Sequence, residues 1–272
     1  MNELDQIASE IRKKLLQNIV KAGGGHTGGS MSSVDILVAL YFEVMNIDPG
    51  NPAWKERDRF VMSKGHSVES IHAVLSRKGF FSEKVLDSYG DFQSILAGHP
   101  TREVPGIEVN SGALGHGLSV GVGMALAAKR SGSSWRTFVL MGDGEHGEGS
   151  IMEAAAAAGH YRLDNLVAII DRNGLQISGK TEEVMSIENL EAKYRACGWS
   201  VRYCNGHNMG ELISALRDTP FKKGLPSVLI ARTKKGKGVS FMEGQASWHH
   251  KVPDPEQLQQ ALEELDSMVE KK

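Results

Sequence analysis

The sequence predicts an α/β protein with a mostly parallel central sheet that is flanked by helices on both faces. Three observations predict it: an apolar run at 138–141 before a glycine-rich loop at 142–149, an alanine-rich helical segment after that loop, and a second apolar run at 166–170. Because a strand–helix–strand unit crosses over with a right hand, the two strands should be parallel and end at one edge of the sheet. Asp143 and Asn173, which follow these strands, are therefore expected to face each other across a crevice.

The other elements follow from periodicity and from helix-start and helix-stop signals. Apolar residues at helical spacing predict an amphipathic amino-terminal helix: Ile7, Ile11, Leu15, Leu16 and Ile19. Ser150 and Glu153 have capping-box spacing and predict the start of the alanine-rich helix. Further on, we expect a helix at 189–196 ended by Gly198, a strand at 199–203, a helix at 209–217 and a strand at 227–232.

The length and the unbroken alternation of helix and strand favour one domain. A chain of 272 residues can bury a sizeable core and lies near the upper limit for a single domain. We therefore expect one diphosphate-binding domain over residues 1–272. Its carboxyl-terminal helical extension begins at about Pro253 and is expected to pack on the surface.

Composition excludes several classes of function. The net charge is −2, so nothing indicates binding to nucleic acid or to an anionic membrane. No apolar run is long enough to cross a bilayer or to form a signal-peptide core. Cys197 and Cys204 are expected to be reduced, mostly buried thiols, and a cytoplasmic location follows. Lys234, Lys235 and Lys237 form a basic run that we interpret as a solvated strand end.

The glycine-rich loop has two interpretations. Gly142, Gly144 and Gly147 satisfy the G-x-G-x-x-G spacing of a dinucleotide site, which predicts a nicotinamide-dependent dehydrogenase. Asp143 argues against this, because a carboxylate placed there repels a diphosphate unless a cation intervenes. Magnesium prefers oxygen ligands from one or two carboxylates together with phosphates, so Asp143 and the Asn173 amide favour a magnesium diphosphate site.

These residues resemble the thiamine diphosphate signature of transketolases. The resemblance rests on Gly142-Asp143-Gly144, Glu148-Gly149 and Asn173, and it extends through five more segments in order: Gly25 to Gly29, Met62 to His66, Gly98 to Pro100, Ser111 to Gly117, and Trp248-His249. It implies a thiamine-diphosphate-binding fold with thiamine diphosphate and Mg²⁺ as cofactors. The implied metal ligands are Asp143, Asn173 and the backbone carbonyl of Leu175. The implied cofactor-binding residues are His66, Gly112, Leu114, Gly142, Asp143, Gly144, Glu148, Asn173 and His249.

Histidines supply the candidate catalytic groups. Six of the ten lie in loops that contain glycine or proline, and an unperturbed imidazole titrates near neutrality, as proton transfer on sugar hydroxyls requires. The resemblance implies catalytic roles for His26, His66, His99 and His249. His116 occupies a position where the family often has glutamine, so it is left out. We expect structural roles for His72, His146, His160 and His207.

Departures from the family pattern concern the substrate and the partner. Thr27, Lys64 and His250 stand where proline, asparagine and glycine are common, which puts the preferred sugar in doubt. Transketolases also have a pyrimidine-binding domain and a carboxyl-terminal domain, which this sequence lacks. The resemblance therefore implies the amino-terminal subunit of a split transketolase, in a heterotetramer with a carboxyl-terminal subunit. Ketol transfer between sugars or sugar phosphates is the expected activity.

Three alternatives remain open from sequence. Another thiamine enzyme shares the diphosphate motif, such as a deoxyxylulose-phosphate synthase or the decarboxylating subunit of a 2-oxo-acid dehydrogenase. The nicotinamide-dependent dehydrogenase is the second alternative. A non-catalytic assembly subunit is the third, because half of the active site is expected on another chain.

Overall fold

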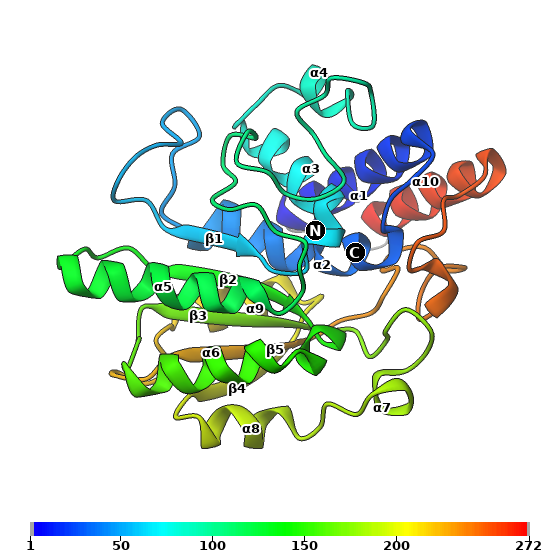
Figure 1. The fold of residues 1–272 in the computed structure, drawn as a ribbon. Helices are drawn as coiled ribbons and strands as arrows, with labels where there is room; N and C mark the ends of the chain where they lie inside the picture. Colours follow the sequence, from blue (N-terminus) through cyan, green and yellow to red (C-terminus); the bar gives the residue numbers. More distant parts are fainter. Residues whose placement is uncertain (1–2, 271–272) are drawn as a thin grey trace.

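A five-stranded sheet in which every pairing is parallel forms the centre of the molecule (Figure 1). The computed structural model describes residues 3–270. The strands are β1 (Arg59–Met62), β2 (Thr137–Gly142), β3 (Leu166–Arg172), β4 (Ser200–Asn205) and β5 (Ser227–Arg232). Their order across the sheet is β1-β2-β3-β5-β4. The predicted α/β fold with a parallel sheet is therefore confirmed.

The register aligns the carboxyl ends of the strands at one edge. Gly142 at the end of β2 lies opposite Asp171 of β3, and Asp171 lies opposite Ala231 of β5. The segments that leave β1, β2, β3 and β5 consequently start from the same edge of the sheet. This is the edge at which open parallel sheets bind their ligands.

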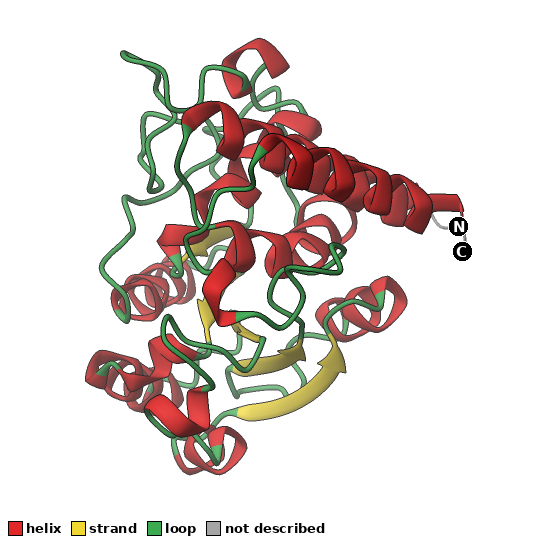
Figure 2. Cartoon of the chain, turned by 90° about the vertical axis from the view of Figure 1, so that its right-hand side faces the viewer, coloured by secondary structure: helices red, strands yellow, loops and turns green. Residues whose placement is uncertain are grey.

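Helices cover both faces of the sheet (Figures 1 and 2). On one face lie α5 (His116–Ser131), α6 (Gly149–His160) and α8 (Leu190–Ala196). On the other lie α1 (Glu3–Ala22), α2 (Thr27–Ala39), α3 (Val68–Lys78), α9 (Met209–Arg217) and α10 (Pro255–Glu270). The sheet separates two hydrophobic cores, and alternate residues of β2 pack in each. Phe138 and Leu140 pack in one core, and Val139 and Met141 pack in the other. Burial on both faces explains why these strands are continuous apolar runs.

Helix α2 is buried along its whole length and packs against α1, α3 and α9. Its serines are accommodated by hydrogen bonds: Ser33 Oγ, for example, donates to the carbonyl of Gly29 at 3.1 Å. A one-turn π-helix, η1 (Leu40–Val44), continues it. The segment that carries His26 thus runs directly into the most enclosed helix of the protein.

Short helical segments complete the fold. They are η2 (Gly65–Ser67), α4 (Glu83–Leu86), η3 (Gly144–Gly147), α7 (Thr181–Val184) and η4 (Ala246–Trp248). Across residues 3–270, no helix combines the length and the apolar composition that crossing a bilayer requires. Cys204 is buried, Cys197 is half-buried, and both are free thiols, as expected.

Most of the expected elements form, one expectation needs correction, and one strand was not expected. Ser150 does not cap α6: the helix begins at Gly149, and Ser150 Oγ donates instead to the carbonyl of Gly115 at 3.0 Å. Strand β1 was not expected, because its four residues are too few to show a period. Helix α10 packs along α1 at the surface and buries Ala261 and Leu265 there.

Candidate functional site

The loop after β2 directs two buried carboxylates toward the sheet edge. Asp143 accepts hydrogen bonds from the backbone N–H of Gly144 at 2.8 Å and of Gly174 at 2.6 Å. Glu145 accepts from the backbone N–H of Gly142 at 3.0 Å and of Gly115 at 2.8 Å. Burial raises the pKa of both carboxyl groups, and the charge of Asp171 adds to the rise for Asp143. Arg172 already pairs with Asp143 at 3.2 Å, yet the pKa of Asp143 stays raised, so a further cation beside this carboxylate would be favourable.

Asn173, which follows β3, lines the same cavity as Asp143. The cavity has a volume of about 250 Å³, and its walls also include Gly142, Gly144 and Leu175. Among residues 3–270, no cluster of three or more His, Cys, Asp or Glu side chains could hold a metal ion. Glu145 also lines the cavity, but its carboxylate is already held by Ser63 and by the backbone N–H groups of Gly115 and Gly142. The Asp143 carboxylate, the Asn173 amide and backbone carbonyls form a donor set that suits magnesium when phosphate oxygens complete it.

Three imidazoles form another wall of this cavity: His26, His66 and His249. The ring centroid of His26 lies 5.2 Å from that of His66 and 5.5 Å from that of His249. The rings of His66 and His249 stack at 5.5 Å. Burial, helped by neighbouring positive groups, lowers the pKa of His66 to about 2, that of His249 to about 3 and that of His26 to about 4. All three rings are therefore neutral at physiological pH.

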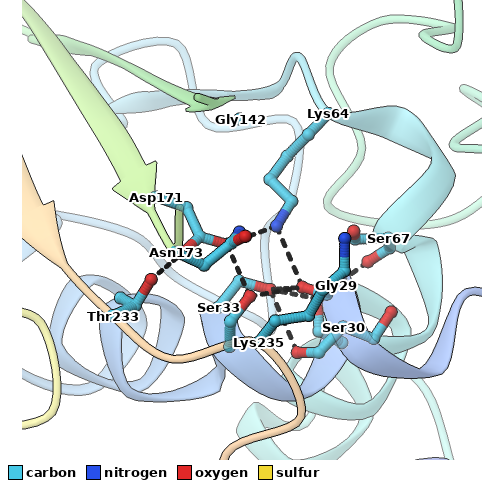
Figure 3. Close-up of polar contacts among 12 residues, drawn as sticks. Gly29, Ser30, Ser33, Lys64, Ser67, Gly142, Asp171, Asn173, Thr233 and Lys235 are labelled. Carbon is cyan, nitrogen blue, oxygen red and sulfur yellow. Dashed lines mark hydrogen bonds and ion pairs between the residues drawn. The ribbon is translucent and has the colours of Figure 1, made fainter. Parts of the chain in front are cut away.

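Two buried lysines complete the cavity (Figure 3). Lys64 forms an ion pair with Asp171 and also donates to the carbonyl of Gly29 at 2.9 Å. Lys235 is only 2% exposed, so the expectation that it belongs to a solvated basic run is wrong. Burial and the nearby Lys64 ammonium lower the pKa of Lys235 to about 8. Its neighbours Lys234 and Lys237 do reach solvent and pair with Glu243.

The comparison with known proteins places this arrangement in a family. Residues 4–266 match the family model described as the transketolase thiamine diphosphate binding domain. The chain belongs to the transketolase family.

This transketolase domain is found both in relatives of about the same length as this chain and in longer transketolases. The chain is 56% identical over 96% of its length to a protein of Phocaeicola vulgatus that is named as one subunit of an apulose-4-phosphate transketolase, and it covers 92% of that protein. It is 43% identical to the 6-deoxy-6-sulfo-D-fructose transketolase subunit SqwG of a Clostridium species, over 97% of this chain and 96% of that protein. Among solved structures, it matches the transketolase of Leishmania mexicana with a TM-score of 0.91 and 31% identity. That match covers 98% of this chain but only 42% of the Leishmania chain.

The remaining transketolase residues expected from sequence lie in and around the cavity. Gly112 and Leu114 line it. Gly112 has φ of +147°, and a Cβ atom there would lie 2.8 Å from the His99 ring, so the close approach requires glycine. His99 is exposed, with its ring centroid 6.3 Å from that of His26, and it does not line the cavity wall. Glu148 is also exposed, at the start of α6 and outside the cavity lining.

The histidines expected to be structural are held away from the cavity. His146 lies between the carbonyl of Gly142, at 2.9 Å, and the Tyr194 hydroxyl, at 3.0 Å. The Nδ1 atom of His207 lies 2.6 Å from a carboxylate oxygen of Asp35. His72 is fully buried beside Tyr89. None of these three contributes to the cavity wall.

Sequence reasoning missed several residues of the site. Lys235 and Glu145 line the cavity but were not proposed as functional residues. His250 was noted only as a departure from the family, yet its ring centroid lies 4.5 Å from that of His26. The signal for Glu145 was its position in the glycine loop. No sequence signal distinguishes Lys235 from its solvated neighbours.

Proposed function

We propose that this chain is the diphosphate-binding subunit of a transketolase that uses thiamine diphosphate and Mg²⁺ to move a two-carbon ketol unit from a ketose to an aldose. One observation carries the proposal. Segments after four parallel strands bring a carboxylate, an amide, a buried ammonium and neutral imidazoles to one cavity. This combination suits a metal-bound diphosphate next to a reacting sugar.

The cofactor's tail fits the residues present. Asp143, Asn173 and the Leu175 carbonyl would hold Mg²⁺, and the buried Lys235 ammonium would balance diphosphate charge. Gly112, Leu114, Gly142 and Gly144 would let backbone approach the cofactor, and Glu148 stays a prediction as a cofactor contact. When bound, thiamine diphosphate supplies the carbon centre at which the carbon–carbon bond of the ketose is broken.

The imidazoles would act on the sugar. His26, His66 and His249 are neutral, so each can both donate and accept a hydrogen bond. We propose that the three imidazoles hold the hydroxyl and carbonyl oxygens of the substrate and that proton transfer between these oxygens takes place among them. His99, which is exposed beside His26, would contact the terminal hydroxyl of the donor.

A second polypeptide would complete the active site. The relatives from Phocaeicola vulgatus and Actinobacillus succinogenes are each named as one subunit of an apulose-4-phosphate transketolase, and the chain covers 92% and 96% of their lengths. It covers only 43% of human transketolase. We therefore propose a separate partner that carries the pyrimidine-binding and carboxyl-terminal domains, assembled with this single-domain chain as a cytoplasmic heterotetramer.

The substrate class is a ketose with an anionic group. The names of two relatives specify a sugar phosphate and a sulfo sugar as what those proteins act on. Both sugars carry a terminal anion. We propose that this chain serves a ketose donor of the same kind, and that the aldose acceptor is a sugar or a sugar phosphate.

A reconstitution assay tests the proposal. The purified chain, with saturating thiamine diphosphate and Mg²⁺, is assayed for ketol transfer from a panel of phosphorylated, sulfonated and unmodified ketoses. The assay is then repeated with the partner subunit, and the mass of the complex is measured in solution. We expect transfer only from the complex, and none when Asp143→Ala replaces the wild-type chain. Full activity of the isolated chain, or turnover of pyruvate in place of ketoses, would contradict the proposal.

A further inference from the structure

Lys235 makes an unusual contact for a buried lysine. Its Nζ atom lies 2.9 Å from Nδ1 of His249, which follows η4. Among residues 3–270, no carboxylate lies within ion-pair distance of Lys235. The charges of two carboxylates reach Lys235, and both are already engaged. Asp143 pairs with Arg172 at 3.2 Å, and Asp171 is held by Lys64, Ser32 and Thr233. Figure 3 shows the contacts of Asp171 with Lys64 and Thr233. The Lys235 ammonium therefore donates its hydrogen bond to the imidazole of His249.

The position of Lys235 is fixed by its surroundings. A Cβ atom on Gly28 would lie 2.8 Å from Lys235 Cγ, so the aliphatic stem packs directly on the backbone of α2. The backbone N–H of Gly236 donates to the carbonyl of Gly28 at 3.0 Å, which ties the lysine's loop to the same helix. The packing of the stem on Gly28 and the backbone hydrogen bond of Gly236 thus hold the ammonium group of Lys235 at the imidazole.

This contact determines where the proton of His249 lies. A lysine ammonium has three donors and no acceptor, so Nδ1 of His249 has to accept, and in a neutral ring the proton is then on Nε2. On the basis of the function proposed above, we infer that Lys235 is a positioning residue that holds His249 in its Nε2–H tautomer, so that this imidazole donates a hydrogen bond into the cavity.

The inference assigns different roles to the histidines. Among the described residues, no acceptor is found for Nε2 of His249, and the ring lines the cavity. An Nε2–H group facing a substrate stabilises negative charge on a carbonyl oxygen as that charge develops. His249 cannot remove a proton from the substrate, because its only basic lone pair, on Nδ1, already accepts the hydrogen bond from Lys235. Proton acceptance then falls to His26 and His66, which have no such constraint.

Spectroscopy on the full-length chain tests the tautomer without any turnover. Nitrogen resonances of labelled histidine are recorded at neutral pH, and the signals of His249 are identified by their loss in His249→Gln. We expect an unprotonated Nδ1 and a protonated Nε2 in the wild type, a mixture of tautomers in Lys235→Met, and the wild-type pattern in Lys235→Arg. Lys234→Met removes the adjacent exposed lysine and should leave the pattern unchanged. A protonated Nδ1 in the wild type, or an unchanged pattern in Lys235→Met, would overturn the inference.

Two substitutions of His249 test the consequence in the assembled enzyme. A glutamine amide reaches the position of Nε2, whereas an asparagine amide reaches only that of Nδ1. With saturating cofactor, we expect His249→Asn to lower kcat by about 100- to 1,000-fold and His249→Gln to retain about tenfold more activity than His249→Asn. Equal loss in both, or a more active asparagine variant, overturns the inference. Absence of ketol transfer in the wild-type complex would instead contradict the proposed function, and the spectra would still report the tautomer.

Discussion

Lys64 and Asp171 form an ion pair inside the protein, with side chains that are 2% and 0% exposed. They belong to segments far apart in the sequence and meet beneath the cavity, where Asp171 also accepts from Ser32 and Thr233. Burial alone would raise the pKa of Asp171, but the Lys64 ammonium and these hydrogen bonds lower it. The pair joins α2, β1, β3 and the loop after β5.

The first prediction concerns this pair. Lys64→Met should reduce the free energy of unfolding by about 3–5 kcal/mol, because it leaves the Asp171 carboxylate buried without its cation. The double variant Lys64→Met with Asp171→Asn should recover a large part of the loss, since no uncompensated charge remains. Denaturant unfolding of both variants and of Asp171→Asn alone gives the coupling energy. A coupling near zero would show that the pair is not energetically linked.

The second prediction concerns the metal site. Asp143→Ala or Asn173→Ala should abolish magnesium-dependent binding of thiamine diphosphate in the assembled enzyme, because each removes an oxygen ligand next to the diphosphate. Calorimetric titration of the cofactor with and without Mg²⁺ measures this. Glu153→Ala, on α6 away from the cavity, is a matched carboxylate control. Unchanged affinity in both site variants would refute the metal assignment.

The third prediction separates binding from turnover. His99→Ala and His249→Ala should bind cofactor nearly as the wild type does but turn over about ten- to ten-thousandfold more slowly, because the lost contacts act in the transition state or in proton transfer. Since His99 is exposed and lies outside the cavity lining, its loss should affect the KM for the donor more than the loss of His249 does. His160→Ala, which lies outside the cavity lining, is the control. Wild-type rates in both site variants would give these residues structural roles.

The fourth prediction concerns acid stability. Burial lowers the pKa of His72 to about 3 and that of His146 to about 4, whereas an unfolded histidine titrates near 6.5. Between these values the unfolded state binds more protons, so stability is complete above about pH 6.5 and falls at lower pH, by about 2 kcal/mol per histidine at pH 5. The midpoint of thermal unfolding should therefore decrease from pH 7 to pH 5.

His72→Leu tests the origin of this effect. Neither ring nitrogen of His72 has a hydrogen-bond partner among the described residues, so leucine should be tolerated or stabilising at pH 7. At pH 5 the free energy of unfolding of the variant should exceed that of the wild type by more than it does at pH 7, because one proton-binding group of the unfolded state is gone. If the free energies of unfolding of variant and wild type differ by the same amount at pH 7 and pH 5, His72 does not contribute to the acid sensitivity.

Much of the fold was predictable because local signals agree with it. The helices expected at 189–196 and 209–217 form, and each is capped by an asparagine whose side chain accepts from the backbone: Asn189 from Ala192 N–H and Asn208 from Glu211 N–H. Gly198, with φ of +83°, ends α8 as expected. The Ser150 signal failed because its hydroxyl found the carbonyl of Gly115, a partner that no local pattern reveals.

The site was predictable only in part. Asp143 and Asn173 follow strands that are visible in the sequence, so parallel pairing alone brings them to one edge. The burial of Lys235 depends instead on Gly28, which is remote in sequence and packs on its stem. A run of lysines indicates solvent exposure on average, and only the three-dimensional neighbours show which member is enclosed.

Assembly of the site from the ends of β1, β2, β3 and β5 also makes the cofactor a probe of folding. A partly folded chain that lacks any one of these strands lacks part of the binding surface, so affinity should appear only when the whole sheet has formed. A ligand that binds only the folded chain stabilises the folded chain by mass action, by about 2.7 kcal/mol at a free ligand concentration one hundred times Kd. Supply of the vitamin-derived cofactor would then regulate how long the chain persists in the cell as well as how fast it works.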